Sequence, residues 1–167
     1  ESCRDLLENF GGHTYAAGLS LKEENLDAFT QRFLKLAADE IIPEQMTPQI
    51  DIDAVLDLQD INAKFMSELK KMNPFGPDNQ KPVFCSLGVK DYGTSKLVGK
   101  DLEHIKLELI DDKSNTPIHG IAFGMHQHNT HIKNMKPFNI CYTIEENTYN
   151  GNTSLQLMVK DIKENDI

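Results

Sequence analysis

The first residues in the sequence whose types could bind a ligand are two adjacent glycines followed by a histidine, Gly11, Gly12 and His13. Adjacent glycines let backbone N–H groups approach a phosphate or a base without obstruction from a Cβ atom. His13 could bond a phosphate oxygen or a ribose hydroxyl, and the small residues 16–18 would let a neighbouring segment pack closely. A helix C-cap followed by a tight turn has the same composition. Composition alone favours the turn, and the binding loop stays open as the alternative.

A second candidate group consists of His126, His128 and His131, whose imidazoles could bind a transition metal. No Cys or carboxylate stands at a supporting spacing in this polar stretch. The sequence therefore favours a solvent-exposed loop over a metal site.

Four aspartates, Asp51, Asp53, Asp57 and Asp60, are dense enough to resemble a metal cluster. Their spacing places Asp51 and Asp53 on the exposed face of one strand and Asp60 at the start of a helix, where aspartate is a common N-cap. We therefore predict a solvated strand face and a helix cap.

Basic residues gather between positions 81 and 106, and they form the only region suited to a phosphate backbone. The set is Lys81, Lys90, Lys96, Lys100, His104 and Lys106. Tyr92, Tyr142 and Tyr149 offer surfaces on which bases could stack. An exposed lysine face without a ligand is the alternative interpretation, and the residues alone do not decide between the two.

The net charge of −9 argues against nucleic acid as a partner of the chain as a whole. Its distribution is uneven, because residues 1–80 carry 7 Lys/Arg against 15 Asp/Glu while residues 81–167 carry 10 against 11. No nucleophile–base pair, Walker loop or GxGxxG motif occurs. The sequence thus contains no recognisable catalytic centre, and we predict no metal site in it.

The three cysteines are far apart and form no CxxC motif, which is typical of a reducing compartment. No apolar run reaches the ~18 residues of a membrane helix, and no secretory signal is visible. We therefore expect a cytoplasmic protein without a membrane partner. Because the chain opens Glu-Ser-Cys-Arg rather than with Met, we expect a piece of a longer protein.

The elements that must position these groups are predicted from periodicity. In the first half we expect a helix over 2–9 ended by the glycine pair, an extended segment over 14–21, and a helix that runs to Ile41. Ser20 and Glu23 have the spacing of a capping box for that helix. A strand over 49–58 and a helix that buries Ile61, Phe65 and Leu69 follow.

From residue 83 the period changes to two. Strands are predicted over 83–98, with a bend near Gly88 or Gly93, and over 104–111, 116–123, 138–144 and 154–159. A short helix is expected within 124–135, and the YNGN sequence at 149–152 is typical of a hairpin. Five strands with a helix after the third have the order of an OB-fold barrel.

Taken in order, several stretches resemble one known family. FGGHTYAAGLSL at 10–21 is similar to the glycine–histidine motif of the DHH-associated domain in the DHH phosphoesterase superfamily. The segments that follow resemble the rest of the RecJ family of single-strand-specific 5′→3′ exonucleases: IDID (50–53), NPFGPDNQKPVF (73–84), GKDLEHIKLEL (99–109), GIAF (120–123) and LQLMVKDI (155–162). The glycine motif is shared with nanoRNases and cyclic-dinucleotide phosphodiesterases, whereas the proline-rich linker and the barrel are more specific to the RecJ family.

The resemblance implies an α+β chain in three parts. Residues 1–43 would be the C-terminal part of a DHH-associated α/β domain, residues 44–80 a strand–helix linker, and residues 81–167 a five-stranded OB-fold barrel. In the family a separate DHH domain holds two Mn²⁺ or Mg²⁺ ions, and no Asp-His-His triplet occurs in this chain. We therefore expect this chain alone to be inactive as a nuclease.

The resemblance also assigns candidate substrate contacts. Gly11, Gly12 and His13 would contact the DNA backbone near the scissile phosphate, and Lys100, His104 and Lys106 would lie on or near the OB face. The implied partner is single-stranded DNA, with a single-strand-binding protein as a further candidate, and we expect a monomer. A protein-docking OB module, or a piece of another DHH-family phosphodiesterase such as a nanoRNase, is the alternative.

Overall fold

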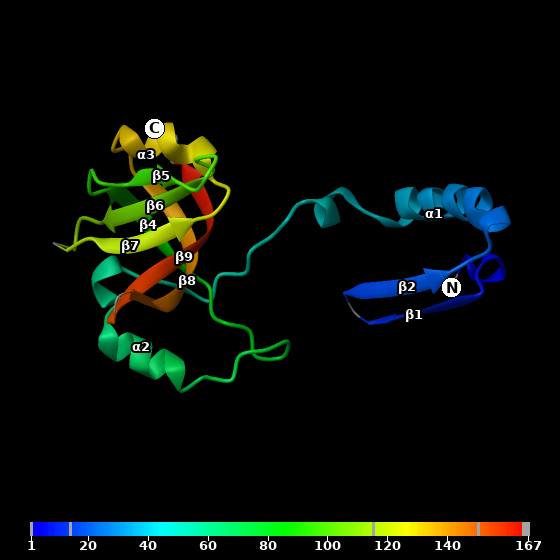
Figure 1. The fold of residues 1–167 in the computed structure, drawn as a ribbon, viewed down its shortest axis with the longest axis horizontal. Helices are drawn as coiled ribbons and strands as arrows, with labels where there is room; N and C mark the ends of the chain where they lie inside the picture. Colours follow the sequence, from blue (N-terminus) through cyan, green and yellow to red (C-terminus); the bar gives the residue numbers. More distant parts are fainter. Residues whose placement is uncertain (1, 14, 115, 150, 165–167) are drawn as a thin grey trace. The chain divides into compact units, whose positions relative to one another are not determined.

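The computed structural model describes residues 2–13, 15–114, 116–149 and 151–164 (Figure 1). The chain divides into two compact units, Glu1–Ile50 and Asp51–Ile167, which we call the N-terminal and C-terminal units. The predicted three-part division into 1–43, 44–80 and 81–167 stays a prediction.

The N-terminal unit is a β-hairpin followed by one long helix. Its elements are a 3₁₀ turn (Arg4–Leu6), β1 (Asn9–His13), β2 (Ala16–Ser20), a 3₁₀ turn (Glu23–Asn25), α1 (Leu26–Glu40) and a 3₁₀ turn (Pro43–Met46). β1 and β2 pair antiparallel, with Gly11 opposite Gly18 and Gly12 opposite Ala17. The long helix and the extended segment before it are as predicted.

Two predictions for the N-terminal unit are wrong. Residues 2–9 do not form a helix, because the glycine pair is part of strand β1 and completes a backbone ladder with small residues of β2. Ser20 does not cap α1, since it is the last residue of β2 and pairs with Asn9. The helix begins only at Leu26, after a 3₁₀ turn, and its N-cap position is Asn25.

The described part of the C-terminal unit is a seven-stranded sheet with two α-helices and two 3₁₀ turns. Its elements are β3 (Ala54–Val55), a 3₁₀ turn (Leu58–Asp60), α2 (Ala63–Lys70), β4 (Phe84–Asp91), β5 (Lys96–Val98), β6 (His104–Ile110), β7 (Ile118–Ala122), a 3₁₀ turn (His126–His128), α3 (Asn129–Lys133), β8 (Phe138–Tyr149) and β9 (Asn152–Glu164). The strand order is β3-β4-β8-β9-β7-β6-β5. β4 also pairs with β6 through Lys90 and Asp91, so the ladder β4-β8-β9-β7-β6 returns to β4.

The core of the C-terminal unit follows the predicted alternation. On β6, Ile105, Leu107 and Leu109 are fully buried, and the residues between them face outward. β8 also buries Phe138, Ile140, Tyr142 and Ile144, but Cys141 and Thr143 between them are buried too, and the register with β9 shifts between Cys141 and Tyr142. Since burying one such side chain stabilises the fold by about 1.5–3 kcal/mol, this alternation fixes which side chains remain outside.

Three further predictions need correction. Of the strand expected over 49–58, only Ala54–Val55 is a strand, and it pairs in parallel with Phe84 and Cys85 at the edge of the sheet. Asp60 does not cap α2; Asn62 does, because its side chain accepts hydrogen bonds from the backbone of Lys64 and Phe65. Tyr142 offers no stacking surface, since its side chain is fully buried.

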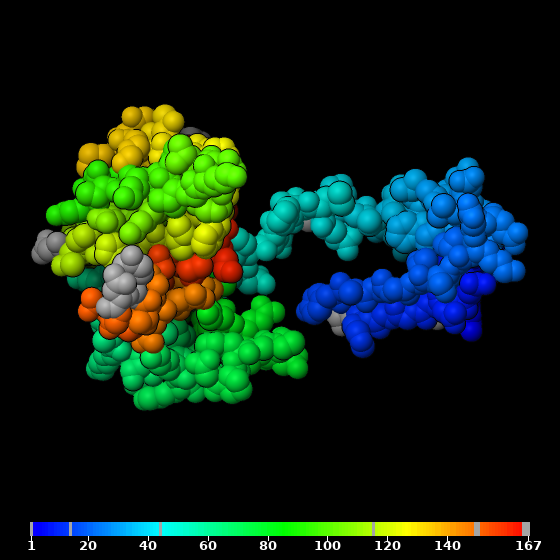
Figure 2. All heavy atoms as spheres, in the orientation of Figure 1, coloured from blue at the N-terminus to red at the C-terminus, as the bar shows by residue number. Residues whose placement is uncertain are grey.

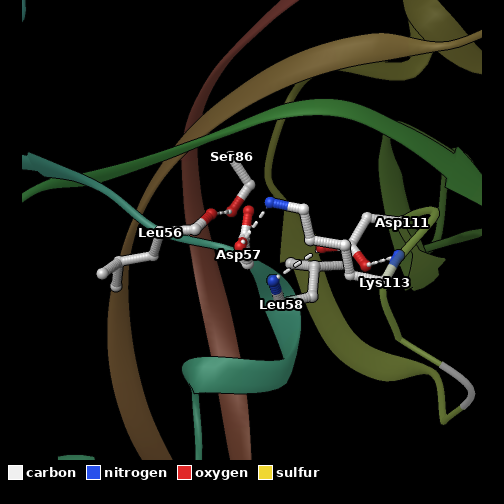
Figure 3. A network of polar contacts seen from close by, with 6 residues as sticks. All are labelled: Leu56, Asp57, Leu58, Ser86, Asp111 and Lys113. Carbon is white, nitrogen blue, oxygen red and sulfur yellow. Dashed lines mark hydrogen bonds and ion pairs between the residues drawn. The ribbon is translucent and has the colours of Figure 1, made fainter.

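Buried polar groups fasten the segment before α2 to the sheet (Figure 3). The hydroxyl of Ser86 donates to the carbonyl oxygen of Leu56 at 2.7 Å and lies 2.7 Å from the Tyr142 hydroxyl. Because the carbonyl can only accept, the Ser86 proton is used there, and Tyr142 must donate to Ser86. Burial also raises the pKa of Tyr142, so it stays a protonated donor.

This direction of donation predicts unequal effects of two substitutions. Ser86→Ala leaves both the Tyr142 hydroxyl and the Leu56 carbonyl without this partner and should destabilise the fold by about 1–3 kcal/mol. Tyr142→Phe keeps the bond from Ser86 to Leu56, so its cost should be about 0.5–1.5 kcal/mol. Urea unfolding of both variants measures the difference, and a larger loss for Tyr142→Phe would show that the donation runs otherwise.

Candidate functional site

The glycine pair lies in the hairpin of the N-terminal unit, and its two members have different surroundings. A Cβ atom on Gly12 would come within 2.7 Å of the Ala16 carbonyl oxygen and 2.9 Å of the Ala17 Cα atom. A Cβ atom on Gly11 would meet nothing within 4 Å. Gly12 therefore allows the two strands to approach, whereas Gly11 leaves one stretch of backbone open to a ligand. His13 ends β1 and is exposed.

These surroundings predict opposite results for two alanine substitutions. Gly12→Ala forces the backbone of β2 to shift and should destabilise the hairpin by about 1–3 kcal/mol, whereas Gly11→Ala should be tolerated. Amide hydrogen exchange of residues 9–13 and 16–20 measures the effect. Equal protection in the two variants would contradict the assignment of the close approach to Gly12.

An apolar groove of about 370 Å³ lies between the hairpin and α1. It is lined mainly by Phe10, Ala17, Leu19, Phe29, Phe33 and Leu36. Within the described part of the N-terminal unit only Cys3 is buried, so this surface carries large exposed apolar side chains. Gly11 and Gly12 also line the groove, which has no cationic lining residue and therefore offers a phosphate no charged partner.

Two of the candidate basic residues, Lys96 on β5 and Lys106 on β6, are exposed. The strands β5, β6 and β7 lie side by side (Figures 1 and 2). Lys96 pairs with Lys106 across β5 and β6, and Lys106 pairs with Ile121 on β7. Paired residues share a face of a sheet, so these side chains lie together on the outside. A shallow groove of about 400 Å³ continues over β8 and β9, and its lining is Val98, Lys106, His119, Ile121, Asn147, Ser154 and Gln156. We call this surface the β6 face.

The lysines of the region differ in whether they have an anionic partner. Lys81 is 2.7 Å from Glu145, and Lys90 is 3.1 Å from Asp112, so both charges are compensated. Lys96, Lys100 and Lys106 are exposed and form no ion pair with any described residue. Their ammonium groups are therefore available to an anion such as a phosphate.

His104 begins β6, and both of its ring nitrogens are engaged. The backbone N–H of Gly124 donates to Nδ1 at 3.0 Å, which requires a lone pair there. The proton of the neutral ring is then on Nε2, 3.2 Å from Glu103. The pKa of Glu103 is lowered, chiefly because its carboxylate accepts a hydrogen bond from its own backbone N–H. Desolvation acts in the opposite direction, and a further hydrogen bond from the backbone N–H of Asp101 lowers the pKa again. His104 is thus held in place by its neighbours.

The aromatic residue beside His104 was not predicted from the sequence. The Phe123 ring is 4.9 Å from the His104 ring, edge to face at 79°, and the residue is 55% exposed. The period of two offered a signal, since Gly120 and Ala122 are buried and Phe123 follows on the opposite side. Of the tyrosines predicted to stack, Tyr92 is exposed at the turn after β4, and the Tyr149 side chain lies outside the described residues.

The predicted solvated loop is wrong for two of the three histidines, His128 and His131, whereas His126 is exposed. His126–His128 is a 3₁₀ turn and Asn129–Lys133 is α3, as expected of a short helix. His128 and His131 both contact the Glu164 carboxylate, at 2.8 and 3.1 Å, and His131 also contacts the Pro137 carbonyl oxygen. These contacts join α3 to the end of β9. Among the described residues no cluster of three or more His, Cys, Asp or Glu side chains could hold a metal ion.

Strand order and helix position define the class of the C-terminal unit. Its sheet, with α3 between β7 and β8 and β9 parallel to β7, has the OB arrangement. The family model described as the RecJ OB domain matches residues 52–161, about two thirds of the sequence. The chain belongs to the RecJ OB domain family. Among the helices of the described residues, none is long and apolar enough to cross a membrane.

Curated relatives agree with the family. The chain is 29% identical over 160 residues to the single-stranded-DNA-specific exonuclease RecJ of Bacillus subtilis, which covers 95% of this chain and 20% of that protein. It is 28% identical over 158 residues to the RecJ of Salmonella typhimurium, covering 95% of this chain and 27% of that protein. The chain thus spans between a fifth and about a quarter of these relatives.

The fold is also similar to that of a solved structure. RecJ from Thermus thermophilus in complex with Mn²⁺ aligns with a TM-score of 0.75 at 21% identity, over 99% of this chain and 23% of that one. This likeness concerns the fold alone.

Proposed function

We propose that this chain supplies single-stranded DNA binding to a RecJ-type metal-dependent exonuclease. The observation that carries the proposal is the β6 face, where Lys96 and Lys106 present uncompensated positive charge on an OB domain, with Lys100 exposed in the loop between β5 and β6. Single strands bind OB domains through a cationic groove along the phosphate backbone. Three such cations would give a modest, salt-dependent affinity.

In this proposal the five strands β4, β6, β7, β8 and β9 form a closed barrel, with β3 and β5 added to it. The support is that each of the five pairs with two others. A closed barrel would hold β6 and β7 rigidly, so the lysine positions would be fixed before DNA arrives.

The hairpin would have a separate role in the whole protein. The open backbone at Gly11 and the exposed His13 suit contact with a phosphate, and the close approach at Gly12 would keep that strand flat. We propose that residues 11–13 face the catalytic cleft and contact DNA near the scissile phosphate, as the family motif implies.

The metal-dependent chemistry would belong to residues outside this sequence. Mn²⁺ or Mg²⁺ would be used by the whole enzyme, but the described residues lack a suitable cluster of donors, and the sequence has no Asp-His-His triplet. We therefore assign no catalytic step to this chain. We propose a cytoplasmic protein that acts as a monomer, with a single-strand-binding protein as a further partner.

Fluorescence anisotropy with a labelled oligo-dT tests the proposal. The chain should bind at about 50 mM salt and lose most of its affinity at about 200 mM. Incubation of a 5′-phosphorylated strand with the chain and Mn²⁺ should release no mononucleotides. Absence of binding at low salt would overturn the proposal and favour a protein-docking module, and clear mononucleotide release would overturn the assignment of catalysis to residues outside this chain.

A further inference from the structure

The geometry points to Phe123 as a base-stacking platform for the bound single strand, positioned by His104. This inference rests on the proposed function and adds to it a second kind of contact. The ligand is a nucleobase of any identity, because stacking uses the π-face that every base has. His104 would then be a positioning residue rather than a direct contact to DNA.

The Phe123 ring is both exposed to solvent and held in place by a neighbouring side chain. Phe123 is 55% exposed, whereas the neighbouring Ala122 is fully buried. The edge-to-face contact with His104 supports one side of the ring. An aromatic side chain that is held in place and left uncovered loses little entropy on binding, and this favours affinity.

The support behind His104 is continuous with the loop before β6. Glu103 contacts His104 Nε2 at 3.2 Å and accepts a hydrogen bond from the backbone of Asp101 at 3.0 Å. Gly99 has a positive φ, and a Cβ atom there would come within 2.9 Å of all three atoms of the Glu103 carboxylate group. A glycine at position 99 therefore leaves space for the Glu103 carboxylate. This carboxylate holds His104, and His104 in turn contacts the Phe123 ring.

Lysines without an ion-pair partner in the described part of the chain stand on either side of His104 in the sequence. Lys100 belongs to the same loop, and Lys106 follows His104 by two residues on the same face of β6. A base on the Phe123 ring would bring its own phosphates toward these ammonium groups. The anion sites and the stacking surface thus form one binding site.

Two substitutions at Phe123 test this in the full 167-residue chain. Because the sequence contains no tryptophan, Phe123→Trp introduces a single tryptophan, whose fluorescence can be excited apart from that of the tyrosines. Its fluorescence should be quenched by oligo-dT and unaffected by an abasic strand of equal length, and Leu87→Trp, at an apolar position of similar exposure, should respond to neither. Phe123→Ala should weaken binding of oligo-dT by about 5- to 100-fold and leave binding of the abasic strand unchanged.

His104→Ala provides the test of positioning. It should weaken oligo-dT binding in the same direction as Phe123→Ala and leave the abasic strand unaffected, which a general loss of folding would not do. If the native chain binds both strands and Phe123→Ala weakens neither or both alike, the stacking site is wrong and the proposed function stands. If the native chain binds neither strand, the proposed function fails and the stacking site with it.

Discussion

Replacing Lys96 and Lys106 together by alanine is expected to weaken binding of oligo-dT by roughly 10- to 100-fold at about 50 mM salt. Each cation that contacts a phosphate of a single strand contributes about 0.7 to the slope of log affinity against log salt. The double variant should therefore show a slope smaller by about 1.4, which anisotropy titrations at several salt concentrations measure.

The control removes the same charge elsewhere. Lys81→Ala with Lys90→Ala changes the net charge equally, but these ammonium groups already face Glu145 and Asp112. It should alter the affinity and the slope much less. Because Lys96 and Lys106 are like charges directly opposite each other, their removal should also leave the melting temperature unchanged or slightly raised. Equal losses of affinity in the two double variants would contradict a site on the β6 face.

Asp111→Ala is expected to destabilise the chain by about 2–4 kcal/mol. The Asp111 carboxylate accepts the backbone N–H of Leu58 at 2.7 Å and that of Lys113 at 3.0 Å (Figure 3). Leu58 is buried, so its N–H would be left without this acceptor. The substitution therefore loosens the segment that leads into α2, and urea unfolding measures the loss.

The same carboxylate predicts a pH dependence of stability. Burial acts to raise the pKa of Asp111, but hydrogen bonds from Leu58, Lys113 and Ser114 outweigh it, and the pKa is lowered. A lowered pKa stabilises the fold above about pH 3.9, the value of an unfolded aspartate, and this contribution is lost as the pH falls through the folded value. Asp91, whose burial is likewise outweighed by hydrogen bonds from Ser95, adds to the trend.

Asp111→Asn removes the negative charge of the side chain but keeps its size and shape. The amide keeps an acceptor oxygen but cannot ionise, so the difference in unfolding free energy between native chain and variant should grow from about pH 2 to about pH 5 and then level off. A difference that stays constant over this range would exclude ionised Asp111 as its source.

Local alternation predicted the sheet because one face of each strand is buried. Ile105, Leu107 and Leu109 had to point inward, and Lys106 was thereby placed outside. The hairpin could not be predicted in the same way, since Gly11 and Gly12 suit either a helix end or a ladder. What decided between them is the pairing with Ala17 and Gly18, a contact that periodicity does not encode.

The lysines of the candidate site were named from the sequence and stay a prediction, whereas the proposed aromatic contact was not named. A run of lysines is visible in the sequence, but which of them are neutralised depends on Glu145 and Asp112, which are distant in sequence from their partners. Tyr142 was expected to stack and is buried. Phe123 was overlooked because it follows the end of β7, and its proposed role depends on the ring of His104 on β6.

The position of β9 has a consequence for biosynthesis. β9 pairs with β8 along nearly its whole length and with β7 through residues 156–159. As the polypeptide leaves the ribosome, β7 and β8 therefore expose edges of unpaired backbone until Asn152–Glu164 has been made, and exposed edges promote aggregation. Translation that stops between β8 and β9 would yield a product that depends on chaperones, whereas the 13 residues of β9 would cover both edges and let the unit fold.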